Sequence, residues 1–453
     1  MQVCVVGAGF VGLVTSVYMA TLGHIVSCVD KDETKVKLIN SGKLPFHEAG
    51  LKEALAKVLD VNLSVTDDLI QASLNAEYVF VCVGTPTSRS GGIDLSFLEA
   101  VVSDLSETLK HTVTKGKTFI VKSTVVPGTT RKLFIEQMEA RSGKTYGADF
   151  FVAMNPEFLR EGSAVDDAFN PDRVIVGADN VTTTSRVLSL FSDVPSELKI
   201  SVGLETAEMC KYLSNMFFAS LISFSNEIAR LCESVPGVQP DALFRSLYFD
   251  RRLSVSFASQ EQRAIGASTY LWPGVGFGGS CFPKDVEAIS NFGLQNDVAT
   301  PLLDSVLKIN KSQTSHLLNR LFENFSFDSA TVLGLSFKPE TDDIRDSKSL
   351  EIISALLNRG IPVSVYDPLV KTLPEGYDVT HEKDLMTAIK NSSLLIIATS
   401  WDVFKSEKVI SNILREQPVV LDCRLFLSSY SDKIVNYMGP GIYIMPSSRR
   451  TLT

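Results

Sequence analysis

The sequence predicts an α/β protein with two Rossmann-like doubly wound domains, joined by a central helical region that contains one long helix. Three observations support this. A glycine-rich turn at residues 7–12 follows the first apolar strand. Apolar strands alternate with helical patterns over 1–200 and again over 330–422, as in parallel sheets covered by helices. Between them, residues 204–233 form a helical pattern without proline or glycine. We therefore expect domains at 1–200, 201–312 and 313–453.

Composition excludes several classes of function. The chain has 453 residues, 45% of them hydrophobic and 21% charged, with a net charge of −9. A net negative chain has no general attraction to nucleic acid or an anionic membrane, so an anionic ligand needs a local basic pocket. Its seven cysteines are scattered without a CxxC pair, which favours a reducing cytoplasm and predicts neither disulfides nor a metal site. The apolar stretch 3–22 lacks a basic start and is interrupted by glycines, unlike a signal peptide.

The first unit of the chain predicts a dinucleotide site. Residues 2–6 form a β-branched strand that leads into GAGFVG and then into a helical pattern through Thr21. A second strand at 24–29 ends at an acid, Asp30, 18 residues after the last glycine of the motif. Gly7, Gly9 and Gly12 would shape the turn and admit a pyrophosphate at the helix N-terminus.

Asp30 predicts the choice of dinucleotide. A carboxylate at the end of the second strand accepts a hydrogen bond from the ribose 2′-hydroxyl, and it repels the 2′-phosphate of NADP. Lys31 and Lys35 lie nearby in the sequence and would soften this preference. We expect NAD as the cofactor.

Polar residues follow three further strands of the first domain. Thr85, Thr124 and Glu157 each come shortly after a predicted strand, and ligands of doubly wound sheets bind beyond the carboxyl ends of strands. We expect these side chains to face one crevice, although local capping by such turn residues is an alternative. The strands are predicted at 77–83, 118–122 and 150–154.

The long helix at 204–233 carries two polar side chains on a mostly apolar surface. Lys211 and Asn215 are four residues apart and therefore share one helix face. Buried polar groups need partners, so an ammonium and an amide directed into the crevice are one interpretation. The alternative is a lysine that extends to solvent and an asparagine that caps a neighbouring segment.

One cysteine is the strongest candidate for catalysis. Cys281 lies in the run GGSCFPKD, with glycines before it and Lys284 and Asp285 after it. A thiol is a strong nucleophile even at neutral pH, so it suits an oxidation that passes through a covalent thioester. The alternative is an inert core cysteine. None of the five histidines lies in these motifs, which disfavours a histidine-dependent hydroxy-acid dehydrogenase.

The C-terminal part repeats the strand and helix alternation without the glycine motif. The sequence GLSFK at 334–338 stands where a phosphate loop would be, so this half would hold a different ligand or pack structurally. Its strands are predicted at 330–335, 362–366, 394–399 and 419–422, with a helix at 347–357.

Five segments together give the chain a resemblance to the nucleotide-sugar 6-dehydrogenase family. They are GAGFVG at 7–12, STVVPGTT at 123–130, NPEFLREG at 155–162, GGSCFPKD at 278–285 and FKPETDDIR at 337–345. The resemblance runs in order through nearly the whole chain. It implies an NAD-binding domain, a central dimerisation region that carries the catalytic cysteine, a C-terminal nucleotide-sugar domain, and a homodimer.

The resemblance also implies roles for individual residues. Cys281 would be the nucleophile, Asp285 and Thr124 would position water, Lys211 and Asn215 would stabilise oxyanions, and Glu157 would handle protons. The implied cofactor contacts are Gly7, Gly9, Gly12, Asp30, Lys35, Thr85, Thr124, Glu161, Lys284 and Arg345, and the implied substrate contacts are Phe158, Leu159, Arg160, Glu161, Lys211, Asn215, Arg263, Tyr270, Gly274, Phe277, Gly278 and Lys338.

The resemblance implies a substrate as well. The residues around Cys281 favour UDP-glucose, oxidised at its C6 hydroxyl to the carboxylate in two NAD-dependent steps. A GDP-mannose or N-acetylated UDP-sugar dehydrogenase is the alternative, and a non-catalytic binder of NAD and nucleotide sugar is the alternative from a different class. The chain departs from the family pattern at Ala49, where proline is usual, and at Trp272, where a smaller or polar residue is usual and the nucleotide-sugar pocket is expected to lie nearby.

Overall fold

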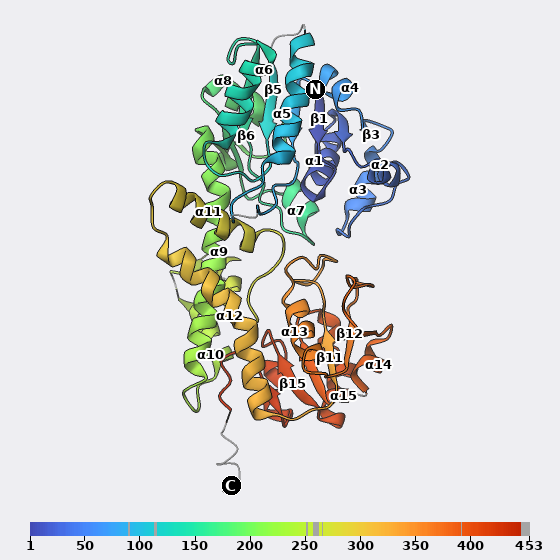
Figure 1. Cartoon of the computed structure of the whole chain (residues 1–453), viewed down its shortest axis with the longest axis vertical. Helices are drawn as coiled ribbons and strands as arrows, with labels where there is room; N and C mark the ends of the chain where they lie inside the picture. The colour runs from blue at the N-terminus through green and yellow to red at the C-terminus, as the bar shows by residue number, and fades with distance from the viewer. Residues whose placement is uncertain are drawn as a thin grey trace. The chain divides into compact units, whose positions relative to one another are not determined.

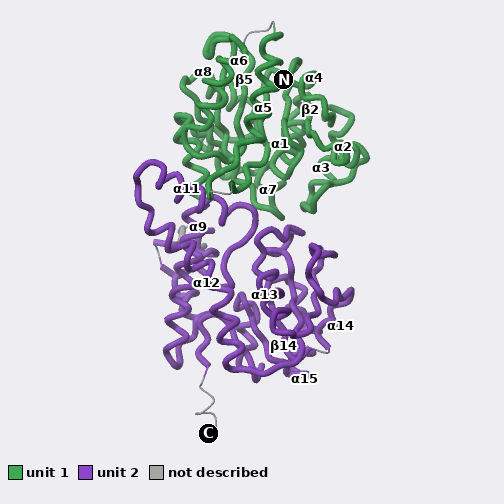
Figure 2. The backbone as a smooth tube through the Cα atoms, in the orientation of Figure 1, with its two compact units in different colours: residues 1–214 green, residues 215–453 purple. Residues whose placement is uncertain are grey.

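The computed structural model describes residues 1–88, 91–112, 116–250, 252–256, 262–264, 266–390 and 392–444, with only the backbone of 254–256 and 262–264. Two compact units make up the chain, residues 1–214 and 215–453 (Figure 2). The boundary falls within one helix, α9 (Leu204–Cys232). Within the described ranges, no helix combines the length and the apolar character that crossing a membrane requires.

An eight-stranded sheet forms the centre of the first unit, in the order β3-β2-β1-β4-β5-β6-β7-β8. Neighbouring strands are parallel except β6 and β7, which meet in antiparallel fashion. This is the doubly wound arrangement that the alternating pattern predicts. The strands are β1 (Gln2–Val6), β2 (Ile25–Val29), β3 (Leu63–Thr66), β4 (Tyr78–Val81), β5 (Lys117–Val121), β6 (Phe150–Met154), β7 (Val174–Gly177) and β8 (Lys199–Val202).

Helices cover both faces of this sheet and enclose two separate cores (Figure 1). Strand β4 shows why, because side chains alternate between the faces of a strand. Its Phe80 packs in the core with α1, while Val79 and Val81 pack in the core with α5. The helices are α1 (Phe10–Thr21), α2 (Glu33–Asn40), α3 (Leu51–Val58), α4 (Leu69–Asn75), α5 (Ser96–His111), a π-helix (Arg131–Gln137) continued by α6 (Met138–Ser142), α7 (Ala164–Phe169) and α8 (Val181–Leu188).

The second unit begins with a helical region. Helix α9 continues into it and packs with α11 and α12 around a small apolar cluster of Ala219, Phe277, Val286 and Val306. The elements are α10 (Pro240–Ser246), a two-stranded hairpin of β9 (Ser254–Ser256) and β10 (Gln262–Ala264), a 3₁₀ turn (Gly266–Tyr270), α11 (Phe282–Gln295) and α12 (Pro301–Asn324).

A six-stranded parallel sheet completes the second unit, in the order β13-β12-β11-β14-β15-β16. Its topology repeats the doubly wound pattern, so the predicted fold class is confirmed (Figure 1). Its elements are β11 (Ala330–Leu333), α13 (Lys348–Leu357), β12 (Val363–Tyr366), β13 (Thr380–His381), α14 (Leu385–Lys390), β14 (Leu394–Ile397), α15 (Glu407–Glu416), β15 (Val419–Asp422) and β16 (Tyr437–Met438).

Hydrogen bonds from Lys117 of β5 connect the first sheet to the C-terminal end of α4. The buried ammonium donates to the carbonyls of Ser73 and Ala76, each at 2.5 Å, at the end of that helix. Lys117→Met keeps the side-chain volume but leaves these carbonyls unpaired, so we expect a loss of about 2 kcal/mol. In a unit of this size that lowers the Tm by about 4–8 °C. Differential scanning calorimetry measures it, with the exposed Lys57→Met as control; equal Tm values for the two variants would contradict this account.

Candidate active site

The turn between β1 and α1 has the backbone geometry that a pyrophosphate needs. Gly7 has φ +100°, and a Cβ on Gly12 would stand 1.7 Å from the Gly7 carbonyl oxygen, so neither position accepts a side chain. No heavy atom lies within 4 Å of the place a Cβ on Gly9 would take, and no side chain caps the N-terminus of α1. The helix therefore presents its first N–H groups beside a glycine cradle that fits the cofactor phosphates.

Asp30 lies at the end of β2, directly beside that turn. Its carboxylate accepts hydrogen bonds from the backbone N–H of Ala8 at 2.8 Å and of Asp32 at 3.0 Å, and it pairs with the Lys35 ammonium at 2.8 Å. Burial alone would raise the pKa of Asp30, but the bonds from Lys35 and the two N–H groups outweigh it, so the pKa lies below its usual value. A carboxylate held in its charged form fits a ribose 2′-hydroxyl and repels a 2′-phosphate.

The loops after β4 and β5 are joined by the predicted threonines. The buried Thr85 hydroxyl donates to the backbone carbonyl of Thr124 at 2.8 Å. Ser123 strengthens the junction because its hydroxyl donates to the Val83 carbonyl at 2.7 Å. Thr85 and Thr124 thus lie together, as expected for residues at the ends of adjacent strands. The Thr85 hydroxyl also stabilises the loop locally through its bond to the Thr124 carbonyl.

Glu157 and Lys211 form a buried ion pair in the first unit. Glu157 Oε1 lies 2.6 Å from Lys211 Nζ, and the side chains are 8% and 5% exposed. The other oxygen of Glu157 accepts from the Leu159 N–H at 2.7 Å. Because the ammonium does not reach solvent, the alternative of a solvent-directed lysine is excluded. A charged donor and a carboxylate in a dry environment are equipped to stabilise an oxyanion and to move a proton.

A second buried lysine lies close by and was not singled out from the sequence. Lys122 donates to Asn155 Oδ1 at 2.9 Å, and Asn155 donates to the Ile175 carbonyl at 2.8 Å. Burial lowers the pKa of Lys122. Its position just after β5, next to the predicted Thr124, was the sequence signal that was available.

Glu208 is a further buried carboxylate that sequence reasoning missed. It is fully buried on α9 and accepts from the backbone N–H groups of Gly128 at 2.6 Å and Thr130 at 2.7 Å. Burial raises its pKa, while the bonds from Thr130 and Gly128 oppose that shift. The carboxylate anchors the loop that begins at Thr124. An acid three residues before Lys211 on the same predicted helix was the available signal.

The segment after β6 is tied down by carboxylates of its own unit. The Leu159 and Arg160 N–H groups donate to Glu157 and Asp167, so these two donors are engaged internally. The buried Glu48 carboxylate accepts from Gly162 at 2.7 Å and Ala164 at 2.8 Å. Glu161 lies between these anchors and is half-buried. The Phe158 ring carries the Arg173 guanidinium 3.9 Å from its centroid.

The second unit brings Asn215, Lys284 and Asp285 together. The Asp285 carboxylate is 1% exposed, accepts from Asn215 Nδ2 at 2.6 Å, and pairs with Lys284 Nζ at 2.5 Å. The Asn215 amide therefore donates to a residue of the cysteine motif. This bond to a side chain of a neighbouring helix gives Asn215 a structural partner, as the alternative interpretation expects. Asp285 lies one turn into α11, whose N-cap is Cys281.

Cys281 is the exposed one of the seven cysteines, all of which lie in described ranges and are free thiols. The alternative of a buried core position is therefore excluded, and the reactivity of the thiol stays a prediction. Cys281 occupies the N-cap position of α11, at the positive end of the helix dipole. Its sulfur lies 3.6 Å from the Ser280 hydroxyl oxygen.

The other predicted substrate residues of the central region have mixed placements. The Tyr270 ring stacks on Phe218 of α9 with centroids 4.3 Å apart. Phe277 is 4% exposed and belongs to the apolar cluster, and its backbone N–H and carbonyl both pair with the Asn310 side chain, so the predicted substrate contact is not supported by this geometry. Gly278 packs so closely that a Cβ would stand 2.0 Å from the Asp346 carbonyl oxygen. Arg263 is in β10, where the side chains lie outside the described residues.

Loops that follow strands of the C-terminal sheet carry the basic residues Lys338, Arg345 and Arg424. Lys338 is half-buried beside the Phe337 ring, and Arg345 is an exposed residue paired with Asp343 at 2.6 Å. Sequence reasoning missed Arg424, which follows β15 and donates to the carbonyl of Gly276 at 3.3 Å. A cation just beyond a strand end was its signal.

Trp272, one of the departures from the family pattern, bonds to the same segment. Its indole N–H donates to the Arg424 carbonyl at 2.8 Å, and the ring packs near Phe244. The indole thus fastens the chain before Gly274 to the end of β15.

Two doubly wound sheets, a dinucleotide turn and an exposed thiol at a helix N-terminus define an oxidoreductase of the dinucleotide-dependent class. Three family models match the chain in order. They describe the UDP-glucose/GDP-mannose dehydrogenase family by its NAD-binding domain (residues 1–194), its central domain (205–312) and its UDP-binding domain (331–429). The chain belongs to this family of NAD-dependent nucleotide-sugar dehydrogenases, and NAD is its cofactor.

Individual relatives agree with this assignment. A putative UDP-glucose 6-dehydrogenase of Bacillus subtilis is 36% identical, covering 89% of this chain and 90% of the relative. A UDP-glucose 6-dehydrogenase of Haloferax volcanii is 35% identical, with 94% and 96% covered. The solved UDP-glucose dehydrogenase of Pyrobaculum islandicum has TM-score 0.84 and 32% identity, covering 98% of each chain. A UDP-D-ManNAc dehydrogenase of Pyrococcus horikoshii has TM-score 0.82 and 26% identity, covering 97% of this chain and 99% of its own.

Asp30 gives a direct test of cofactor selection. Asp30→Asn removes the charge that repels a 2′-phosphate but keeps the shape of the side chain. We expect kcat/KM for NADP, relative to NAD, to rise at least about tenfold, equivalent to about 1.4 kcal/mol. Steady-state rates with each dinucleotide measure the ratio. Glu33→Gln, at an exposed acid paired with Lys37, is the control. A wild-type protein that uses both dinucleotides equally would refute the assigned role.

Proposed function

We propose that the protein is a UDP-glucose 6-dehydrogenase that oxidises the C6 hydroxyl to a carboxylate through a covalent intermediate on Cys281. One observation carries the proposal. The exposed Cys281 occupies the N-cap position of α11, and one turn later the buried Asp285 is held by Asn215 and Lys284. A nucleophile beside a fixed carboxylate suits formation and hydrolysis of a thioester.

The names of relatives support UDP-glucose as the substrate. Proteins named UDP-glucose 6-dehydrogenase are 33–36% identical over most of this chain. The structural relatives also include the UDP-D-ManNAc dehydrogenase and a GDP-mannose dehydrogenase at 29% identity and TM-score 0.54. GDP-mannose and N-acetylated UDP-sugars are therefore the competing substrates.

The reaction balances as two oxidations and one hydrolysis. Bound NAD supplies the electron acceptor, so that one primary alcohol, two NAD⁺ and one water yield one carboxylate, two NADH and three protons. Between the oxidations, the Cys281 thiol adds to the aldehyde carbon and its proton passes to the oxygen. The resulting tetrahedral carbon bears the second hydrogen to be removed. Its oxidation leaves a thioester, and water then releases the carboxylate and restores the thiol.

The buried charges divide the remaining work. The Lys211 ammonium, already fixed by Glu157, stabilises negative charge on the reacting oxygen. Asn215 is the second oxyanion donor. Thr124 and Asp285 orient the hydrolytic water, and Glu157 takes up a proton during hydrolysis. Each of these groups is held by its own unit, which limits the reorganisation that the reaction requires.

A substrate panel tests the identity of the sugar nucleotide. The proposal expects kcat/KM for UDP-glucose to exceed that for UDP-galactose, GDP-mannose and N-acetylated UDP-sugars by at least about tenfold. NADH formation at 340 nm measures each rate. A higher value for any other member would replace UDP-glucose, and no NADH with every member would favour a binding protein.

Cys281→Ser tests the covalent step. A hydroxyl is a weaker nucleophile and its ester hydrolyses slowly, so acid formation should fall at least about 10³-fold while both ligands still bind. Mass spectrometry of the intact variant should reveal a trapped ester, or free aldehyde should accumulate. Cys232→Ser, at a buried cysteine of α9, serves as the matched control. Turnover to the acid at near wild-type rate would show that Cys281 is not the nucleophile.

We also propose that α9 mediates self-association. Leu213, Phe217, Phe224 and Leu231 are 50–63% exposed and are spaced by four, seven and seven residues, so they form one apolar stripe. Such a stripe is self-complementary when two copies of a helix pack together. The stripe supports the proposal of a homodimer, and the scattered free thiols favour a reducing cytoplasm as its compartment.

Introducing charged residues into the apolar stripe on α9 tests whether this stripe forms a dimer interface. Phe217→Glu combined with Phe224→Glu should convert a dimer at micromolar concentration into a monomer, because paired carboxylates would have to be buried. Multi-angle light scattering measures the mass. Val61→Glu changes an exposed apolar residue of the first unit and should leave the dimer intact. A wild-type monomer at micromolar concentration would overturn this proposal.

A further inference from the structure

The segment that leads to Cys281 is buried but has no regular secondary structure. Residues 273–277 are all buried and lie between the 3₁₀ turn and α11, outside any helix or strand. Backbone N–H and C=O groups that lose water need other partners. In this segment side chains from two helices supply them.

Three buried amides pair with the backbone of the segment. Asn226 Oδ1 on α9 accepts from the Gly274 N–H at 2.7 Å, and Gln313 Nε2 on α12 donates to the Gly274 carbonyl at 2.8 Å. Asn310 does both at Phe277: Oδ1 accepts from its N–H at 2.7 Å, and Nδ2 donates to its carbonyl at 3.0 Å. These amides are 0–6% exposed and pair with the loop as the backbone of a neighbouring strand would.

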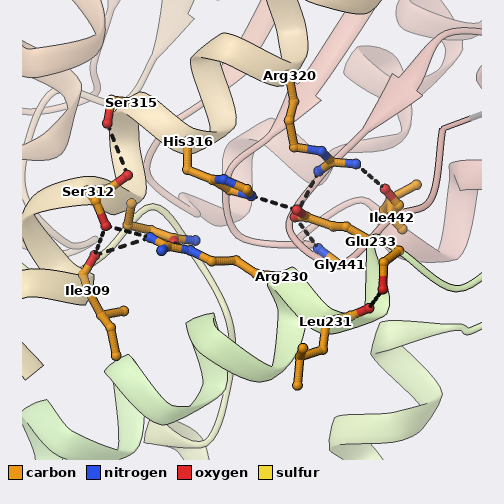
Figure 3. A network of polar contacts seen from close by, with 12 residues as sticks. Arg230, Leu231, Glu233, Ile309, Ser312, Ser315, His316, Arg320, Gly441 and Ile442 are labelled. Atoms are coloured by element: carbon orange, nitrogen blue, oxygen red, sulfur yellow. Dashed lines mark hydrogen bonds and ion pairs between the residues drawn. The ribbon is translucent and has the colours of Figure 1, made fainter. Parts of the chain in front are cut away.

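Arg230 fixes the orientation of one of these amides from behind. Its Nε donates to Gln313 Oε1 at 3.0 Å, so the NH₂ group of Gln313 must point to Gly274. Its NH2 nitrogen donates to the Ile309 carbonyl at 3.3 Å and to the Ser312 hydroxyl at 2.9 Å (Figure 3). Further along α9 and α12, Glu233 pairs with His316 at 2.6 Å and with Arg320 at 2.8 Å.

The segment has little room to shift against the amides. A Cβ on Gly276 would stand 2.6 Å from Asn310 Oδ1. The Arg424 guanidinium also donates to the Gly276 carbonyl, and the Gly279 N–H donates to the Arg345 carbonyl at 3.0 Å. Phe277 lies four residues before Cys281, so its position sets where the chain enters α11.

We propose that Asn310 and Gln313, the latter oriented by Arg230, are positioning residues that set the location of the Cys281 thiol. The inference rests on the proposed function, in which this thiol adds to the aldehyde. The first oxidation does not use the thiol, whereas the second does. Loss of the amides should therefore impair the second oxidation selectively, and aldehyde should escape.

Asn310→Leu tests the inference because it keeps the side-chain volume and removes both bonds to Phe277. We expect acid formation from UDP-glucose to fall about 10- to 100-fold, as for other small misplacements of catalytic groups. The fraction of turnovers that release aldehyde, trapped with O-benzylhydroxylamine, should rise several-fold. The KM for NAD should stay within about twofold, because the nucleotide turn is unaffected.

Two further variants keep the test decisive. Gln313→Glu retains the acceptor for Arg230 but cannot donate to Gly274, so it should release aldehyde in the same way even if Asn310→Leu folds poorly. Asn62→Leu is the matched control, since Asn62 Nδ2 donates to two backbone carbonyls, of Ala20 at 2.6 Å and His24 at 2.8 Å, elsewhere in the chain. It should lower stability without releasing aldehyde.

Wild-type aldehyde release and acid formation in a folded Asn310→Leu or Gln313→Glu protein would overturn the inference. That result differs from failure of the proposed function, which would appear as undiminished acid formation by Cys281→Ser. Aldehyde release in both amide variants, and none in Asn62→Leu, would establish the positioning role.

Discussion

The burial of polar groups along α9 is the constraint on which the candidate site depends. Glu208, Lys211, Asn215 and Asn226 are each at most 7% exposed. At about 100° per residue they fall within an arc of roughly 60° on the helix. Buried polar groups are costly without partners, so each must be met by a specific segment of the chain. The partners are the turn at 128–130, Glu157, Asp285 and Gly274, in that order. Of these partners, Glu157 and Asp285 are themselves predicted catalytic residues, and Gly274 is a predicted substrate contact.

This arrangement explains how irregular loops become precise enough for chemistry. The strands place loop ends at one edge of each sheet, but a loop alone leaves its backbone groups without regular partners. Carboxylates satisfy N–H groups in the first unit, where Glu48 and Glu208 each accept two. In the second unit, side-chain amides satisfy both N–H and C=O groups of the segment before Cys281.

Much of the fold could be predicted from the sequence, because strand and helix periods are local signals. The predicted strand at 150–154 and the long helix at 204–233 agree with β6 and α9 to within one residue. Strands β3, β7 and β8 were not predicted; each has only four residues, and β13 and β16 have only two, so their local patterns are too short to identify them. Lys211 and Asn215 were predicted as a polar pair, but their partners depend on tertiary contacts. The roles of Asn226, Asn310 and Gln313 could not be predicted for the same reason: an amide that pairs with a distant loop has no local pattern.

The central claim is that one thiol carries the substrate through two successive oxidations. Its most direct test is the yield of NADH when a limiting, weighed amount of UDP-glucose is converted to completion with excess NAD. The account predicts two NADH for each UDP-glucose consumed, with UDP-glucuronate as the product. A yield of one, with aldehyde as the product, would contradict the thiol-dependent second step, and a yield of zero would contradict the assignment of an enzyme acting on this substrate.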